Sequence, residues 1–201
     1  MKMIYVVTGL LAISGLVFYL TSCNSKSKAG GQVEQQLQDT TKRQKVDPNN
    51  NPYTDMRNMA LGVTTDQLGV QLPADQTKIY GVVMDWDVGE GTATLVSFTT
   101  GDASLYLSSG GGFIGGGGHD NVIKATTNFI KKSERYLDRA SLTEATPLPD
   151  KNGLTFYFLT NKGKFKATEQ MENIESEKSQ WLDLFTEANN LITEIRIVSE
   201  K

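Results

Sequence analysis

The segment KIYGVVMDWDV, residues 78–88, decides the fold, because its side chains alternate as those of a β-strand do. The alternation divides it into two faces of four residues each. One face holds Tyr80, Val82, Met84 and Trp86, and the other holds Ile79, Gly81, Val83 and Asp85. This pattern predicts a strand.

Two turns follow this strand. Residues 89–91, Gly-Glu-Gly, lead into a second predicted strand over residues 92–100. Gly101-Asp102 marks another hairpin turn, into a third strand over residues 103–108. Three strands joined by such short turns predict an antiparallel meander.

Apolar residues at helical spacing predict three helices, over residues 53–61, 120–140 and 170–197. The apolar face of the first holds Met56, Met59 and Ala60. The stripe of the second consists of Val122, Ala125, Phe129, Ser133, Tyr136 and Ala140. The stripe of the third consists of Trp181, Leu184, Phe185, Ala188, Leu191, Ile192 and Ile195.

A second hairpin is predicted between the last two helices, with strands over residues 154–160 and 165–168 around Asn161-Lys162-Gly163. The order of elements is then helix, three strands, helix, two strands, helix. It predicts an α+β fold with an antiparallel sheet of about five strands and three packed helices. This order resembles that of profilin-like and roadblock-like domains, in which helices surround a five-stranded sheet.

The N-terminus has the pattern of an export signal. Lys2 is followed by the mostly apolar, uncharged residues 4–20, and the small residues Thr21 and Ser22 then precede Cys23. Cys23 is the only cysteine in the chain. This ending resembles the lipobox of bacterial lipoproteins, in which the cysteine becomes the lipid-modified first residue of the mature protein. An uncleaved transmembrane anchor and an ordinary signal peptide are the alternatives.

The resemblance implies a signal peptide over residues 1–22 and a lipidated cysteine at residue 23. Composition then predicts a flexible tether that continues to residue 52 and one globular domain over residues 53–201. The tether is rich in Ser, Lys, Gln and Asn and has few apolar residues. The protein is then expected in the cell envelope, bound to the membrane through Cys23. The expected location is the periplasmic leaflet of the outer membrane if Gram-negative, or the outer face of the plasma membrane if Gram-positive.

Composition excludes several classes of function. The 20 basic and 23 acidic residues give a charge of −3, and without Lys2 the mature chain carries −4, which argues against a nucleic-acid binder. His119 is the only histidine, so zinc sites built on several histidines are absent from the sequence. A Cys-His nucleophilic pair is excluded because Cys23 is assigned to lipid. We expect no cofactor, no metal site and no catalytic residues.

Residues 110–118 contain seven glycines in nine positions. Gly110, Gly112 and Gly115 match the GxGxxG motif. A dinucleotide site also needs an acidic residue at the end of the next strand, and a P-loop needs the sequence GK[ST]; neither is present. Three interpretations remain. The segment is a close-packed crossover with Phe113 and Ile114 in the core, an anion site, or a mobile flap.

The anion site would use backbone amides of the glycine loop, the start of the following helix, and a protonated imidazole. The candidate ligand-binding residues are Gly110, Gly112, Gly115, Gly118 and His119. Asp120 argues against this interpretation, because an acid at that helix start would repel an anion.

Two charged groups have both a functional and a structural interpretation. Asp85, Asp87 and Glu90 place three carboxylates around the first hairpin, as calcium binding or acid–base catalysis would need, although turns commonly carry acids. A basic stripe along the second helix would suit anionic headgroups or an acidic partner, or form a solvated face. It consists of Lys124, Lys131, Arg135 and Arg139.

The sequence therefore predicts a membrane-tethered, extracytoplasmic lipoprotein, most simply a non-enzymatic module that binds a protein or another envelope component. The alternative is a small-ligand or anion-binding domain that uses residues 110–119. An envelope hydrolase that uses carboxylates or His119 has the least support.

Overall fold

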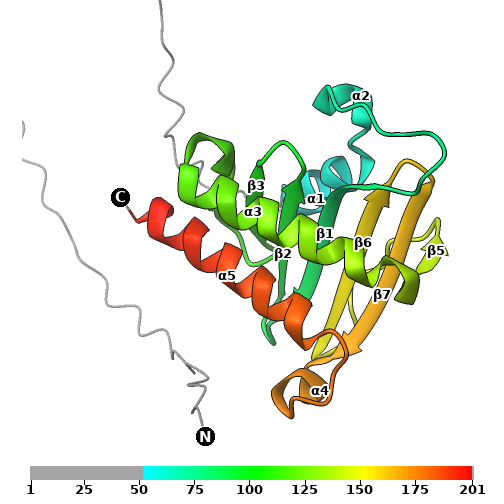
Figure 1. Ribbon diagram of the computed structural model, residues 1–201. Coiled ribbons are helices and arrows are strands. Elements are labelled where there is room, and N and C mark those ends of the chain that lie inside the picture. The colour runs from blue at the N-terminus through cyan, green and yellow to red at the C-terminus, as the bar shows by residue number, and fades with distance from the viewer. Residues whose placement is uncertain (1–51, 201) are drawn as a thin grey trace, which may run out of the picture. The chain divides into compact units, whose positions relative to one another are not determined.

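Strand β1 (Ile79–Asp87) lies at the centre of an antiparallel sheet in the computed structural model, which describes residues 52–200 (Figure 1). These residues belong to one compact unit and form seven strands in the order β4-β3-β2-β1-β6-β7-β5. The other strands are β2 (Thr92–Phe98), β3 (Ala103–Leu107), β4 (Gly112–Phe113), β5 (Ser141–Thr143), β6 (Gly153–Thr160) and β7 (Gly163–Gln170).

The predicted meander and hairpin are confirmed as β1–β2–β3 and β6–β7. The prediction of about five strands was too low, because β4 and β5 add one short strand at each edge. With two and three residues, neither is long enough to show an alternating pattern in the sequence.

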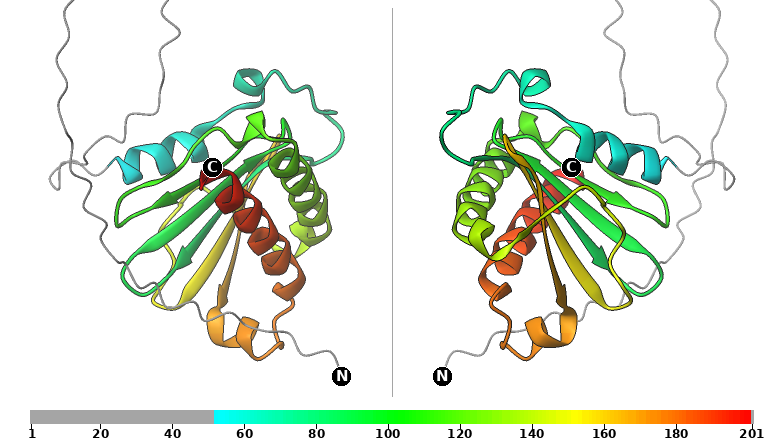
Figure 2. Two further views of the ribbon diagram at one scale, coloured as in Figure 1. Left: turned by 90° about the vertical axis from the view of Figure 1, so that its left-hand side faces the viewer. Right: turned by 90° about the vertical axis from the view of Figure 1, so that its right-hand side faces the viewer.

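Helices cover both faces of the sheet. The five α-helices of the described residues are α1 (Tyr53–Gly62), α2 (Thr65–Leu68), α3 (Asp120–Ser133), α4 (Met171–Glu175) and α5 (Leu182–Ser199). Two short 3₁₀-helices, η1 (Gly116–Gly118) and η2 (Glu134–Arg139), flank α3. Helices α3 and α5 lie side by side on one face, and α1 lies on the other (Figures 1 and 2).

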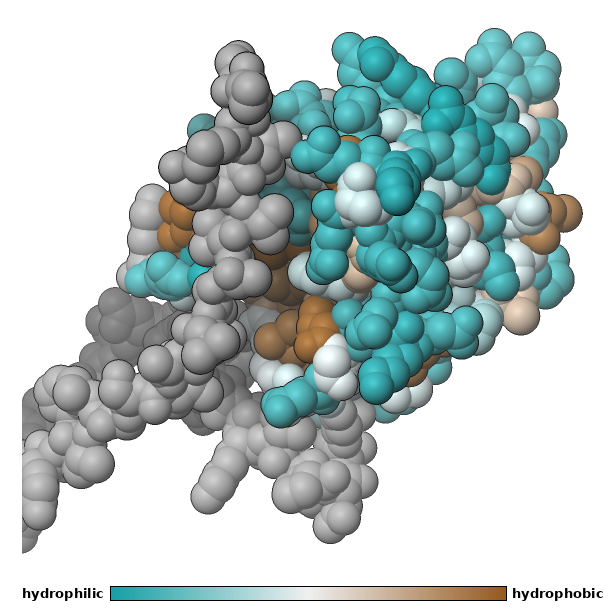
Figure 3. Space-filling view, turned by 90° about the horizontal axis from the view of Figure 1, so that it is seen from below, coloured by the Kyte–Doolittle hydropathy of each residue, from teal (hydrophilic) through white to brown (hydrophobic). Residues whose placement is uncertain are grey.

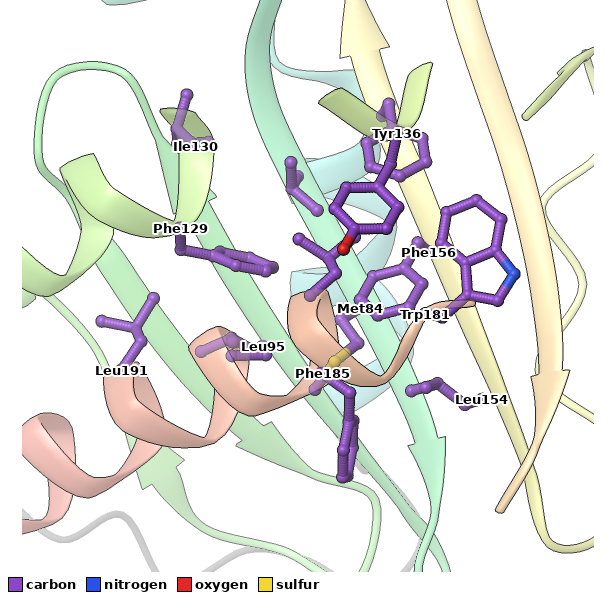
Figure 4. Close-up of a cluster of buried hydrophobic side chains, with 14 of the residues drawn as sticks. Met84, Leu95, Phe129, Ile130, Tyr136, Leu154, Phe156, Trp181, Phe185 and Leu191 are labelled. Carbon is purple, nitrogen blue, oxygen red and sulfur yellow. The ribbon is translucent and has the colours of Figure 1, made fainter. Parts of the chain in front are cut away.

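The larger core lies between the sheet and the α3–α5 pair (Figure 4). Aromatic rings fill much of it: Trp181 lies 5.9 Å from Phe156 and 5.5 Å from Tyr136, centroid to centroid. Aromatic pairs at such distances add about 0.5–1.5 kcal/mol each beyond the burial of their area.

The smaller core lies under α1 and corrects the predicted face of that helix. Ala60 and Leu61 are buried against Val83 of β1, whereas Met59 is 65% exposed. The helix turns this face to the sheet because Arg57, one turn before Leu61, is buried in an ion pair with a residue of β1.

A β-bulge shifts the alternation at the start of β1. The pairing with β6 slips between Ile79 and Gly81, so one extra residue is inserted in β1. Ile79 therefore joins the larger core together with Val82, and Tyr80 packs on the α1 side, the reverse of the predicted faces. The Tyr80 hydroxyl donates a hydrogen bond to the carbonyl of Val63, which follows α1.

The predicted helix over residues 120–140 ends early. The α-helix stops at Ser133 and continues as the 3₁₀-helix η2. The Ser133 hydroxyl donates to the carbonyl oxygen of Phe129 at 2.8 Å, a contact that often bends helices. The tighter winding of η2 buries Tyr136 beside Trp181.

The predicted last helix, over residues 170–197, is two helices. α4 ends at Glu175, and Glu177 adopts a left-handed φ of 59° before α5 begins at Leu182. Glu169 holds this break, because its carboxylate accepts hydrogen bonds from Asn173 and Ser179. Partial burial acts to raise the pKa of Glu169, but these bonds and one from the Gln170 amide outweigh it and lower the pKa.

The outer surface is mainly hydrophilic where Figure 3 shows the described residues, with hydrophobic colour confined to small areas. None of the helices within residues 52–200 has the length and apolar character that a membrane span requires.

The buried face of α1 can be tested with two substitutions in that helix. Leu61→Ala should lower the free energy of unfolding by about 2–5 kcal/mol, because it leaves a cavity under α1. Met59→Ala should change it by less than about 0.5 kcal/mol, because Met59 is exposed. Urea unfolding followed by tryptophan fluorescence measures both. Equal losses for the two variants would contradict this orientation of α1.

Candidate functional site

The glycine loop forms the edge of the sheet beside β3. Strand β4 pairs Gly112 with Tyr106 and Phe113 with Leu105, and η1 then leads into α3. The segment is thus ordinary secondary structure at both ends, joined through residues 114 and 115.

Close packing explains two of the glycines. A β-carbon on Gly112, whose φ is +153°, would overlap the carbonyl oxygen of Leu105. A β-carbon on Gly116 would lie 2.9 Å from the Ala103 carbonyl oxygen and 2.7 Å from a Val122 methyl group. Side chains at these positions would push β4 and η1 away from β3 and α3.

The other predicted ligand-binding glycines have room around them. A β-carbon on Gly110, Gly115 or Gly118 would meet no neighbouring atom within 4 Å, although the positive φ of Gly110 (+104°) and Gly115 (+85°) favours glycine there. His119 is exposed at the N-terminus of α3, with its ring centroid 6.2 Å from that of Phe113. Neither ion pair found within residues 52–200 involves His119.

The crossover interpretation holds for one of its two apolar residues. Phe113 packs against the larger core, but Ile114 is 66% exposed. The expectation that both residues enter the core was therefore wrong for Ile114. The strand alternation at Phe113 turns the next side chain outward.

A buried ion pair lies on the opposite, α1-covered face of the sheet. The Arg57 guanidinium donates from Nε at 2.9 Å and from Nη2 at 2.6 Å to one oxygen of Asp85. Arg57 is 6% exposed and Asp85 is 0% exposed. Burial acts to lower the pKa of Arg57, but the hydrogen bond and charge of Asp85 outweigh it and raise the pKa.

Further hydrogen bonds complete this network. The second oxygen of Asp85 accepts a hydrogen bond from the Thr94 hydroxyl at 2.6 Å, and Thr94 shares a hydrogen bond with the Tyr53 hydroxyl. Burial is the main reason that the pKa of Tyr53 is raised. Asp85 is thus held as a structural carboxylate.

The network extends to the segment that precedes β6. Arg57 Nη2 also donates to the carbonyl oxygens of Thr146 and Pro147. The Tyr157 hydroxyl donates to the same Pro147 oxygen, and the guanidinium lies 5.7 Å from the Tyr157 ring centroid. Burial, followed by the Asp85 charge, raises the pKa of Tyr157 to about 12, so the hydroxyl remains a donor at neutral pH.

A groove of about 290 Å³ lies directly beside this network. One wall is the segment Pro147–Asp150, which Arg57 and Tyr157 hold at Pro147. The floor is formed by β6 and β7 and contains Thr155, Tyr157, Lys166 and Thr168. Its volume is near the lower end of the range of small-molecule sites.

The three carboxylates of the first hairpin do not form one site. Asp85 is buried in its ion pair, whereas Asp87 accepts a hydrogen bond from the Gly89 amide and Glu90 is exposed. Within residues 52–200, no three His, Cys, Asp or Glu side chains gather as a metal site would need.

The basic stripe lies on the solvent-facing side of α3 and η2. Its four residues, Lys124, Lys131, Arg135 and Arg139, are exposed. Arg139 also lies 4.9 Å from the Tyr136 ring centroid, and the neighbouring Lys132 pairs with Asp183 at 3.4 Å.

Cys23 and the predicted tether lie outside the described residues. The chain has no significant match among protein-family models, curated proteins or solved structures. The candidate sites therefore rest on the chemistry of this chain alone.

The sites predicted from the sequence included neither Arg57 nor Tyr157, nor the groove. An aspartate within an apolar strand is unusual, because a buried carboxylate needs a partner, and an arginine of the predicted helix at residues 53–61 was one candidate for it. No pattern in the sequence indicates the groove, because its floor and wall come from three segments.

The close approach at Gly112 predicts different effects for two glycines of the loop. Gly112→Ala should lower the free energy of unfolding by about 1–3 kcal/mol, because it forces an unfavourable φ and a backbone overlap. Gly118→Ala should change it by less than about 0.5 kcal/mol, since its surroundings are open. Thermal unfolding of both variants is the measurement, and a tolerated Gly112→Ala would contradict the packing explanation.

The buried ion pair predicts that Asp85 is needed for stability. Asp85→Asn should lower the free energy of unfolding by about 3–5 kcal/mol, because it leaves the Arg57 charge buried without its partner. Asp87→Asn, two residues along the same strand, is the matched control and should be nearly neutral. Denaturant unfolding measures both, and equal stability of the two variants would show that Asp85 has no such role.

Proposed function

We propose that this chain is a bacterial lipoprotein of the cell envelope, anchored by lipid at Cys23, whose domain binds a protein or another envelope component without catalysis. The observation that carries the anchor is the uncharged, mostly apolar run of residues 4–20 followed by Thr21-Ser22-Cys23. A lone cysteine directly after small residues is what a lipoprotein signal requires.

The state of the titratable groups supports binding over catalysis. Asp85 is committed to an ion pair with Arg57, and the only histidine, His119, is exposed and takes part in neither ion pair of residues 52–200. A general acid or base usually has a perturbed environment and a partner that orients it. An envelope hydrolase that uses these groups is therefore the least supported proposal.

The tether sets the reach of the domain in this proposal. A flexible chain over residues 23–52 spans about 30 Å on average, which carries the domain beyond the lipid headgroups. The absence of an acidic cluster after Cys23 favours the periplasmic leaflet of the outer membrane in a Gram-negative cell. In a Gram-positive cell the anchor would lie in the outer face of the plasma membrane.

The glycine loop supports a second candidate function. The open surroundings of Gly110, Gly115 and Gly118 and the exposed ring of His119 leave room for a small ligand or an anion at the start of α3. Asp120 in the first turn of α3 weighs against an anion. The resemblance to profilin-like and roadblock-like domains likewise stays a proposal, and it concerns the order of elements only.

The anchor is tested by replacing the cysteine. Cys23→Ala should abolish incorporation of radiolabelled palmitate and leave an unprocessed precursor, because no thiol remains for lipid. Ser22→Ala keeps a small residue before the cysteine and should be labelled and processed normally. Labelling and electrophoretic mobility are the measurements, and unchanged labelling of Cys23→Ala would disprove the lipobox interpretation.

A further inference from the structure

Four side chains form a block on the floor of the groove. In the antiparallel register of β6 and β7, Tyr157 lies opposite Lys166, and Thr155 lies opposite Thr168. Residues two apart on a strand point to the same face, so all four share the side of the sheet that carries Asp85. Side chains directly opposite each other on one face are within reach of a single small ligand.

The Thr155 hydroxyl is free within this block. Thr155 is 2% exposed and lines the groove, yet its hydroxyl has no hydrogen-bond partner among the described residues. Every fully enclosed side-chain oxygen or nitrogen of those residues does have a partner. The Thr155 hydroxyl must therefore open onto the groove, where a ligand can reach it.

Lys166 brings the positive charge. It is half-buried in the groove and belongs to neither ion pair found within residues 52–200. An ammonium group beside two hydroxyls is a donor set for an acidic oxygen ligand, since all three groups can donate hydrogen bonds.

The remaining lining limits the charge and shape of that ligand. Two acids line the groove, Asp150 and Glu169, and the carboxylate of Glu169 is held by Asn173 and Ser179, so a doubly charged phosphate would be repelled more strongly than a single carboxylate. Pro147, Leu148 and Pro149 make the wall largely apolar. A carboxylate on a short apolar body matches both the donors and the wall.

We propose that the groove between Pro147–Asp150 and strands β6 and β7 binds a small monocarboxylate. Lys166 and the hydroxyls of Thr155 and Thr168 hold the carboxylate, and the apolar part of the ligand lies against Leu148. The carboxylate belongs either to a free short-chain acid or to the carboxyl end of a peptide. This site does not depend on the anchor at Cys23, so either proposal can fail alone.

The test uses the full chain in non-ionic detergent micelles and saturation-transfer NMR with two acid–amide pairs. Butyrate and butyramide represent a free acid, and N-acetyl-leucine and N-acetyl-leucinamide represent a peptide end. We expect saturable binding of at least one acid with a Kd in about the millimolar range, and much weaker binding of its amide. The acid with the lower Kd shows whether the natural carboxylate belongs to a free acid or to a peptide end.

Variants locate the binding. Lys166→Met should raise the Kd at least about tenfold, because it removes a charged hydrogen bond, and Thr155→Val about threefold or more. Lys164→Met is the matched control and should leave the Kd unchanged, since Lys164 is on the same face of β7 but outside the groove. Lys166 is only half-buried, so Lys166→Met should fold normally. The test can rest on this variant if Thr155→Val does not fold.

Three results would overturn the proposal. The first is that neither acid binds saturably at concentrations up to about 50 mM, far above the Kd of about 1 mM expected for fragments of this size. The second is equal binding of acid and amide. The third is equal weakening by Lys164→Met and Lys166→Met, which would show attraction to general surface charge.

Discussion

The ion pair between Arg57 and Asp85 joins three parts of the domain that are distant in sequence. Asp85 lies in the central strand, Arg57 in the first helix, and the guanidinium also holds the carbonyl groups of Thr146 and Pro147. Burying two charges is expensive unless every donor and acceptor is satisfied. Here the Thr94 hydroxyl donates a hydrogen bond to the second oxygen of the Asp85 carboxylate. The position of α1 and of the groove wall both follow from this one requirement.

The two candidate sites differ in position and chemistry. The glycine loop lies at the β3 edge and offers backbone amides, whereas the groove lies over β6 and β7 and offers side chains. Packing explains Gly112 and Gly116 without any ligand. By contrast, packing does not explain why the hydroxyl of the largely buried Thr155 opens onto the groove without a hydrogen-bond partner among the described residues. The groove is therefore the more specific chemical feature of the domain.

The antiparallel meander and the second hairpin were predictable, because strand alternation and turn residues are local signals. Features that depend on contacts between residues distant in sequence could not be predicted from it. The face of α1 depends on Arg57 meeting Asp85, and the exchange of Ile79 and Tyr80 depends on a bulge against β6. The end of α3 at Ser133 depends on burying Tyr136 beside Trp181. The groove could not be predicted because Lys166 and Thr155 become neighbours only in the sheet register.

The short strands at the two edges of the sheet limit how neighbouring copies of the domain can pair with one another. β4 has two residues and β5 has three, so each of these edge strands offers few unpaired backbone groups to another chain. Lipid anchors confine proteins to two dimensions, where neighbouring copies collide often and in similar orientations. If the proposed anchor holds these domains on one membrane surface, edge strands this short limit the backbone pairing by which neighbouring domains could join into a continuous sheet.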